Sequence, residues 1–177
     1  MEATGAILRL ADWDRRGRYV YLKRDLRKIL GETGDTLSQT LKRLTRKGVL
    51  IRAAHGAYVY ALSPRVGATT VQDVALALRR GEYVFESLES ALAQWGVISQ
   101  APLDRVTLMT TGAGGAFRTP YGVIEFVHTK LSPEQIRRGV LDRPDQPAPI
   151  ATEAFALRNL RRTGRSAELV AEGGAHG

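Results

Sequence analysis

A chain of 177 residues with 44% hydrophobic and 25% charged residues can bury one ordinary hydrophobic core or two small ones, which excludes a wholly disordered protein. The absence of cysteine excludes disulfides, thiolate metal sites and cysteine nucleophiles, and the longest apolar run, Ala57 to Leu62, is far below the roughly 20 residues that span a bilayer. Because Glu2, Thr4 and Gly5 also make a poor signal peptide, we expect a cytoplasmic protein without a membrane partner.

The formal net charge of +8 comes entirely from the N-terminal part of the chain. Residues 1–66 hold 14 Lys and Arg against 6 Asp and Glu, whereas residues 67–177 hold 12 of each sign. Pro64 and Gly67 interrupt the chain where the charge balance changes, so we predict two domains, residues 1–66 and residues 67–177. A basic domain joined to a neutral one indicates that one end of the protein contacts a polyanion.

The sequence of the basic domain predicts three helices followed by a β-hairpin. The expected helices cover residues 3–14, 25–30 and 35–47, with a short extended piece at residues 19–21. Gly31 and Gly34 bracket the turn before the third helix, whose N-cap we expect to be Asp35. Two β-rich runs, at residues 49–53 and 57–61, are joined by a short turn, which favours a hairpin.

This order of elements is that of a winged helix-turn-helix, in which the third helix lies in the major groove of DNA and the hairpin lies beside it. Leu37, Leu41 and Leu44 recur on one face of the third helix, so a rotation of about 100° per residue turns the other face to solvent. The residues of this helix that we expect to contact DNA are Thr36, Ser38, Gln39, Lys42, Arg43 and Arg46. The first three suit base edges, and Gln39 can pair with adenine, whereas the cations suit phosphates or a guanine edge.

A plainer interpretation is that these cations only keep an exposed helix face soluble. Such faces usually mix both charge signs, whereas residues 37–52 contain no acidic residue, which favours contact with DNA. In the hairpin, Arg52 and His55 are further candidates for contact with a minor groove or phosphates. His55 fits an ordinary turn residue equally well.

The neutral domain predicts a small mixed α/β fold, so we expect the whole chain to be α+β. The expected elements are helices near residues 71–78 and 88–95, strands over residues 105–111 and 123–129, and helices over residues 133–138 and 151–162. The glycine-rich stretch of residues 112–122 does not open into a helix as a phosphate-binding loop would. We therefore expect it to be a long flexible hairpin connection between the two strands.

Motifs for catalysis or metal binding are missing from the sequence. His55, His128 and His176 stand far apart without the H-E-x-x-H spacing of a zinc site, and neither G-x-S-x-G nor S-x-x-K occurs. An acid–base pair of His128 with Glu125 is disfavoured because an odd separation places two residues on opposite faces of a strand. We predict that the protein is not an enzyme and has no catalytic residues, metal site or cofactor.

Three acidic residues near the start of the second domain occur at helical spacing. Glu82, Glu86 and Glu89 are three or four positions apart. This spacing favours an ordinary solvated helix face over a catalytic cluster.

The second domain contains the segments YVFESLESALAQWG (residues 83–96), RVTLMTT (residues 105–111) and FRTPYGVIEFVH (residues 117–128). These segments resemble the antitoxin domain of the AbiEi family of antitoxins from abortive-infection systems. The stretch TLSQTLKRLTRKGVLIRAAHGAYVY (residues 36–60) is similar to the winged helix that precedes that domain in the family. The resemblance covers roughly residues 15–165.

The resemblance implies a DNA-binding antitoxin of a type IV toxin–antitoxin system for phage defence. Such a protein is a transcriptional repressor that autoregulates its own operon by binding inverted repeats in double-stranded DNA, and it counteracts a nucleotidyltransferase toxin. The DNA role then belongs to Thr36, Ser38, Gln39, Lys42, Arg43 and Arg52. The resemblance leaves open whether the antitoxin contacts the toxin directly, and it allows self-association on DNA.

A second interpretation comes from a different class of protein. The chain also fits a stand-alone winged-helix transcriptional regulator whose neutral domain binds a small ligand or mediates dimerisation. The two interpretations differ in the partner of the C-terminal domain, which is a toxin in one and an effector or a second copy in the other.

Overall fold

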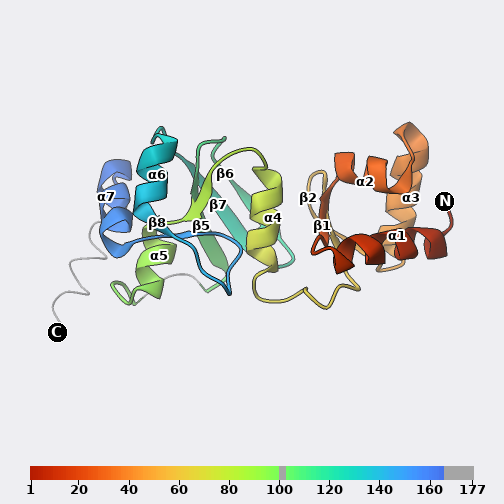
Figure 1. Cartoon of the computed structure of the whole chain (residues 1–177), viewed down its shortest axis with the longest axis horizontal. Coiled ribbons are helices and arrows are strands. Elements are labelled where there is room, and N and C mark those ends of the chain that lie inside the picture. Colours follow the sequence, from red (N-terminus) through yellow and green to blue (C-terminus); the bar gives the residue numbers. More distant parts are fainter. Residues whose placement is uncertain (100–102, 166–177) are drawn as a thin grey trace. The chain divides into compact units, whose positions relative to one another are not determined.

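A computed structural model describes residues 1–99 and 103–165 of the chain, and its architecture is mixed α+β. The described residues form seven helices and two sheets. Contacts within the chain divide it into two compact units, Met1–Leu78 and Arg79–Gly177, which are drawn from red to yellow-green and from green to blue in Figure 1. Each unit has its own sheet and its own buried apolar side chains.

The N-terminal unit packs helices against a three-stranded antiparallel sheet of order β1-β3-β2. Its elements in chain order are α1 (Ala3–Arg15), β1 (Val20–Leu22), α2 (Lys23–Leu30), α3 (Gly34–Arg46), β2 (Leu50–Ala54), β3 (Ala57–Tyr60) and α4 (Thr70–Leu78). The predicted order of three helices and a hairpin is confirmed. Leu37, Leu41 and Leu44 are all at most 2% exposed, so the predicted inward face of α3 is also confirmed.

The N-cap of α3 lies two residues before the predicted one. Thr33 is the N-cap, and its side chain accepts no capping hydrogen bond. Gly34 begins the helix with a φ of 57°, a left-handed conformation that glycine adopts at little cost. Asp35 is therefore not the N-cap, but it lies in the first turn, where its charge still favours the positive end of the helix dipole.

The boundary between the two units follows Leu78, whereas the change in charge predicted a boundary after residue 66. Helix α4 follows residue 66 but belongs to the N-terminal unit. The Tyr19 hydroxyl donates to Asp73 Oδ2 at 2.5 Å and lies 3.2 Å from Thr70 Oγ1. Burial raises the pKa of the Asp73 carboxyl, and the hydrogen bond from Tyr19 partly opposes that shift. These long-range contacts hold α4 beside β1, and a local change in composition does not reveal them.

The C-terminal unit is a six-stranded mixed sheet with helices on one face. The strand order is β6-β7-β5-β4-β9-β8. Its elements in chain order are β4 (Val84–Glu86), α5 (Leu88–Gln94), β5 (Arg105–Thr110), β6 (Gly115–Thr119), β7 (Gly122–His128), α6 (Pro133–Gly139), β8 (Val140–Leu141), β9 (Ile150–Ala151) and α7 (Glu153–Thr163). Helices α5, α6 and α7 gather on the same side of the sheet in Figure 1, and residues from all three share one apolar core with Phe85 and Met109.

Strands β5 and β7 do not form the hairpin that the sequence predicted. They pair in parallel, with Leu108 opposite Phe126. The glycine-rich stretch between them contains β6, which forms the antiparallel partner of β7. Because β6 is an edge strand with exposed glycine and alanine residues, it lacks the alternation of buried and exposed side chains that marks a strand in sequence.

The three acidic residues near the start of this unit do not share a solvated helix face. Glu82 accepts a hydrogen bond from Thr111 Oγ1 at 2.6 Å, and Glu86 lies on β4 and is only 1% exposed. The Glu86 carboxylate accepts hydrogen bonds from Gln94 at 2.7 Å and from Arg143 at 2.7 Å. The prediction of a solvated face was wrong because α5 begins only at Leu88, after a turn out of β4.

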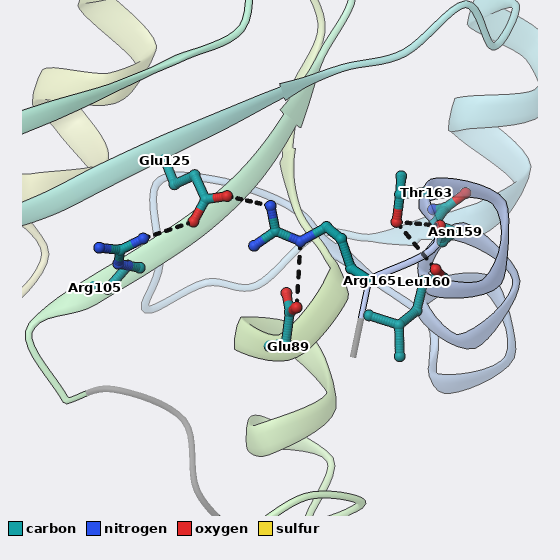
Figure 2. Close-up of polar contacts among 7 residues, drawn as sticks. All are labelled: Glu89, Arg105, Glu125, Asn159, Leu160, Thr163 and Arg165. Atoms are coloured by element: carbon teal, nitrogen blue, oxygen red, sulfur yellow. Dashed lines mark hydrogen bonds and ion pairs between the residues drawn. The ribbon is translucent and has the colours of Figure 1, made fainter. Parts of the chain in front are cut away.

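The end of α7 is tied to the sheet by a network of ion pairs, shown in Figure 2. Arg165 pairs with Glu89 of α5 at 3.2 Å and also with Glu125 of β7. Arg105 of β5 approaches the other oxygen of Glu125 at 2.9 Å. Burial alone would raise the pKa of Glu125, but the hydrogen bonds from Arg165 and Arg105 outweigh it and hold that pKa below its usual value. The network fixes three separate elements to one another.

We expect Arg165→Gln to destabilise the protein by roughly 1–3 kcal/mol at pH 7, because two partly buried carboxylates lose a charged donor. The pKa of Glu125 is lowered by folding, so its contribution is present above the unfolded pKa of about 4.3 and is lost as the pH falls through the folded value. The difference between the urea midpoints of the two proteins should therefore be largest at pH 7 and should shrink as the pH falls below about 4.

Arg138→Gln is the matched control, because among the described residues Arg138 forms an ion pair only with Glu134, on an exposed face of α6. Its expected effect is below about 0.5 kcal/mol. Equal midpoints for the two variants at pH 7 would contradict a structural role for Arg165.

A second substitution tests the place of α4. We expect Tyr19→Phe to cost about 1–2 kcal/mol, because the half-buried Asp73 carboxylate loses its hydroxyl donor. Urea unfolding measures the loss, and Tyr58→Phe is the control because no partner of the Tyr58 hydroxyl exists among the described residues. If both variants unfold at the same urea concentration, the contact between Tyr19 and α4 does not hold the unit together.

Candidate nucleic-acid interface

A basic groove lies on the N-terminal unit between the outward face of α3 and the β2–β3 hairpin. Its volume is about 470 Å³. The residues that line it are Lys23, Ser38, Leu41, Lys42, Thr45, Arg46, Arg52 and Tyr58. Four of these eight residues are cations and none is acidic, so the groove presents positive charge beside a partly apolar wall. We call it the α3 groove.

The shape of the groove follows from the local folding of α3 and the hairpin. Because Leu37, Leu41 and Leu44 pack inward, Ser38, Lys42 and Arg46 fall on successive turns of the exposed face. Arg52 on β2 lies opposite Tyr58 on β3. The register of the hairpin shifts between Arg52 and Ala54, and such bulges re-aim the neighbouring side chains.

Some polar side chains of the α3 groove form hydrogen bonds within the protein, whereas two of its cations form no ion pair with the described residues. Lys23 Nζ donates to Ser38 Oγ at 3.2 Å, and Ser38 Oγ donates to the Gly34 carbonyl at 3.1 Å. Lys42 and Arg46 are exposed and have no ion-pair partner among the residues that the structure describes. Unpaired cations on a rigid helix can neutralise phosphates without first breaking an internal ion pair.

The hairpin tip carries a contact between the two residues predicted there. Arg52 Nη2 lies 3.2 Å from His55 Nδ1, and both side chains are exposed. Since a guanidinium can only donate, His55 Nδ1 accepts, and the neutral imidazole then carries its proton on Nε2. The two exposed side chains thus carry N–H donors, which fit an anionic partner.

The structure brings together only part of the predicted set. Ser38, Lys42, Arg46 and Arg52 line the α3 groove. Thr36 and Gln39 are exposed on α3 but do not line it.

Arg43 faces a different flank of α3 from Lys42 and Arg46. Its guanidinium donates to the Met1 carbonyl and, at 3.3 Å, to Thr40 Oγ1, and the side chain is half-buried. The helical period grouped Arg43 with the outward cations, because a rotation of about 100° per residue turns it away from the buried leucines. In the folded protein it anchors the start of α1.

Sequence reasoning missed Lys23, Thr45 and Tyr58 as lining residues of the α3 groove. Lys23 starts a basic run at the beginning of α2, and this cluster of charge was a usable signal. Tyr58 has no such signal, because only the pairing of β2 with β3 places it opposite Arg52.

The remaining titratable candidates of the C-terminal unit have other partners. His128 Nδ1 lies 2.7 Å from the Gly112 carbonyl oxygen, whereas Glu125 contacts Arg105 and Arg165. The disfavoured pair of His128 with Glu125 is therefore not formed. His176 lies outside the described residues. Across residues 1–99 and 103–165, no group of three or more His, Asp or Glu is arranged to hold a metal ion.

None of the helices in the described part of the chain is both long enough and apolar enough to cross a bilayer.

A solved structure shares the fold defined by these two units. The crystal structure of the RV2827C protein from Mycobacterium tuberculosis is similar with a TM-score of 0.58 and 16% sequence identity, over 89% of this chain and 61% of that chain. The likeness concerns the fold alone, and this chain spans about three fifths of the length of that protein.

Residues 13–140 match the family of unknown function DUF6088, and the chain belongs to that family. A search of curated proteins gave no match.

Replacing each of the two arginines of α3 by alanine should have different effects on the stability of the protein. We expect Arg43→Ala to lower the free energy of unfolding by about 1–2 kcal/mol, because it loses hydrogen bonds to Met1 and Thr40. Arg46→Ala should change it by less than about 0.5 kcal/mol, since Arg46 is exposed and has no ion-pair partner in the part of the chain that the structure describes. Urea unfolding at neutral pH measures both, and the reverse order would contradict the assignment of Arg43 as an anchor.

Proposed function

We propose that the N-terminal unit is a winged helix-turn-helix that binds double-stranded DNA, with α3 as the recognition helix and the β2–β3 hairpin as the wing. The observation that carries this proposal is the α3 groove, in which four cations and no carboxylate surround one face of an exposed helix. The order of three helices and a hairpin agrees with that architecture.

Each part of the interface has a distinct role in this proposal. Ser38 and Gln39 occupy the first turns of α3, where side chains contact base edges. Lys42 and Arg46 lie further along the helix and contact phosphates or a guanine edge. Arg52 and His55 extend the contact from the wing, and Lys23 adds a charge at the start of α2.

We further propose that the protein is an antitoxin that represses its own operon and counteracts a nucleotidyltransferase toxin in the cytoplasm. The support for this part is the resemblance of residues 36–60, 83–96, 105–111 and 117–128 to the AbiEi family. The C-terminal unit then carries antitoxicity, and the N-terminal unit binds inverted repeats upstream of the operon.

A second candidate function is that of a stand-alone transcriptional regulator controlled by a small ligand. One observation favours it, which is a cationic pocket within the C-terminal unit.

DNA binding is tested with single variants and a duplex that contains the upstream region of the gene. We expect Arg46→Ala to weaken binding to every sequence and to reduce the salt slope by about 1, because one phosphate contact is lost. Gln39→Ala should instead cost about 1–3 kcal/mol on the upstream duplex and much less on a scrambled one. Fluorescence anisotropy at several salt concentrations measures both effects.

Arg138→Ala removes the same charge from an exposed site of the C-terminal unit and serves as the control. It should bind both duplexes as the unchanged protein does. If Arg46→Ala binds as tightly as Arg138→Ala at matched salt, the α3 groove is not the DNA interface.

Antitoxicity is tested by co-expression with a nucleotidyltransferase encoded beside this gene. The full chain should restore growth, whereas residues 1–78 should not, because the segments that resemble the antitoxin domain lie beyond Leu78. Growth restored by residues 1–78 would overturn the assignment of antitoxicity to the C-terminal unit. Failure of the full chain to restore growth would favour the stand-alone regulator.

A further inference from the structure

A second pocket lies entirely within the C-terminal unit, between the end of β7 and helix α7. Its volume is about 330 Å³, which is within the range of small-molecule sites. The residues that line it are Met109, His128, Thr129, Lys130, Leu131, Asn159, Arg162 and Thr163. Neither of the functions proposed for DNA or toxin uses these residues. We call it the α7 pocket.

The mouth of the α7 pocket is cationic. Lys130 and Arg162 are exposed, and within residues 1–99 and 103–165 neither has an ion-pair partner. This contrasts with Arg105, Arg143 and Arg165 of the same unit, which all pair with carboxylates. Since no acidic residue lines the pocket, the two cations are available to an anion.

His128 also lines the α7 pocket, and a hydrogen bond fixes its ring. Its Nδ1 lies 2.7 Å from the Gly112 carbonyl oxygen, and because a carbonyl only accepts, Nδ1 carries the proton. The ring is therefore held in one orientation with Nε2 free of that bond. Nε2 can accept a hydrogen bond when the ring is neutral and donate one when it is protonated.

The floor of the pocket combines apolar surface with an unsatisfied amide. Met109 is 3% exposed and belongs to the core, and Leu131 packs against that core. Asn159, labelled on α7 in Figure 2, is fully buried, and its Nδ2 donates to Ser87 Oγ at 3.3 Å. Asn159 Oδ1 has no hydrogen-bond partner among the described residues. Buried polar atoms are nearly always paired, so this oxygen is a place for a donor from a ligand.

The partner of Asn159 lies at a strained turn. Ser87 connects β4 to α5, and the next residue, Leu88, has a φ of 57°. A bulky side chain rarely adopts this left-handed conformation, and such strain concentrates at functional sites. The strained turn holds the Ser87 hydroxyl against Asn159 and thereby fixes the orientation of the amide.

We propose that the α7 pocket binds a small phosphate monoester that also carries an N–H donor, of the class of the nucleoside monophosphates. Lys130 and Arg162 contact the phosphate, Asn159 Oδ1 accepts from the base, and Met109 and Leu131 contact its apolar face. A phosphate monoester carries a charge of about −2 at neutral pH, whereas a ligand with one carboxylate carries a charge of about −1. The phosphate therefore matches the two cations better. This site is independent of the α3 groove.

The test is isothermal titration of the full chain with AMP, GMP, CMP and UMP, and with inorganic phosphate and adenosine as partial ligands. We expect saturable binding of at least one mononucleotide, at least tenfold tighter than inorganic phosphate or the nucleoside. Arg162→Ala and Lys130→Ala should each weaken that binding at least fivefold. Both residues are exposed, so the variants should fold normally, which urea unfolding verifies.

Arg161→Ala is the matched control, because Arg161 is the exposed neighbour of Arg162 on α7 and does not line the pocket. It should bind the mononucleotide as the unchanged chain does. Three results overturn the proposal: no binding of any mononucleotide at millimolar concentration, equal binding by Arg161→Ala and Arg162→Ala, or equal affinity for inorganic phosphate. Binding of single-stranded RNA without binding of mononucleotides also overturns it.

The same variants separate this proposal from DNA binding. Arg162→Ala should bind the upstream duplex unchanged, whereas Arg46→Ala should bind the mononucleotide unchanged. A failure of one site therefore leaves the test of the other intact.

Discussion

The burial of one leucine stripe sets the orientation of α3, and the candidate DNA interface depends on it. Leu37, Leu41 and Leu44 are almost completely buried against the N-terminal unit. Exposing a stripe of this size would cost several kcal/mol, which is far more than any exposed cation on the helix contributes to stability. The helix therefore has one orientation, in which Lys42 and Arg46 face outward beside the hairpin.

The α3 groove and the ion-pair networks of the C-terminal unit use arginine and lysine in different ways. In the α3 groove, Lys42 and Arg46 have no carboxylate partner among the described residues. In the C-terminal unit, by contrast, Arg143 pairs with the buried Glu86 and Arg165 pairs with Glu89. Pairing of this kind neutralises charge and ties elements together, whereas unpaired cations create a field that an anion can enter. In the α7 pocket of the C-terminal unit, Lys130 and Arg162 also have no ion-pair partner in the described part of the chain.

The sequence predicted the N-terminal elements well because their signals are local. The 3.6-residue period of the leucines, the glycines around the turn and the short β-rich runs each lie within a few residues. The start of α3 and the place of α4 were missed, because they depend on a left-handed Gly34 and on hydrogen bonds from Tyr19 across the fold. In the C-terminal unit the edge strand β6 and the parallel pairing of β5 with β7 were missed, since the pattern along a strand does not specify its partner.

The sequence by itself determined that the protein has a basic end and a neutral end, and that the outward face of α3 carries cations. Composition and helical period are properties of the chain, so no tertiary contact is needed to find them. Only the tertiary structure decided which cations lie close to one another. It turned Arg43 toward Met1, placed Arg52 and Lys23 beside Lys42, and brought Lys130 and Arg162 to one pocket. Residues far apart in the chain meet only through packing, and packing is set by the whole buried core.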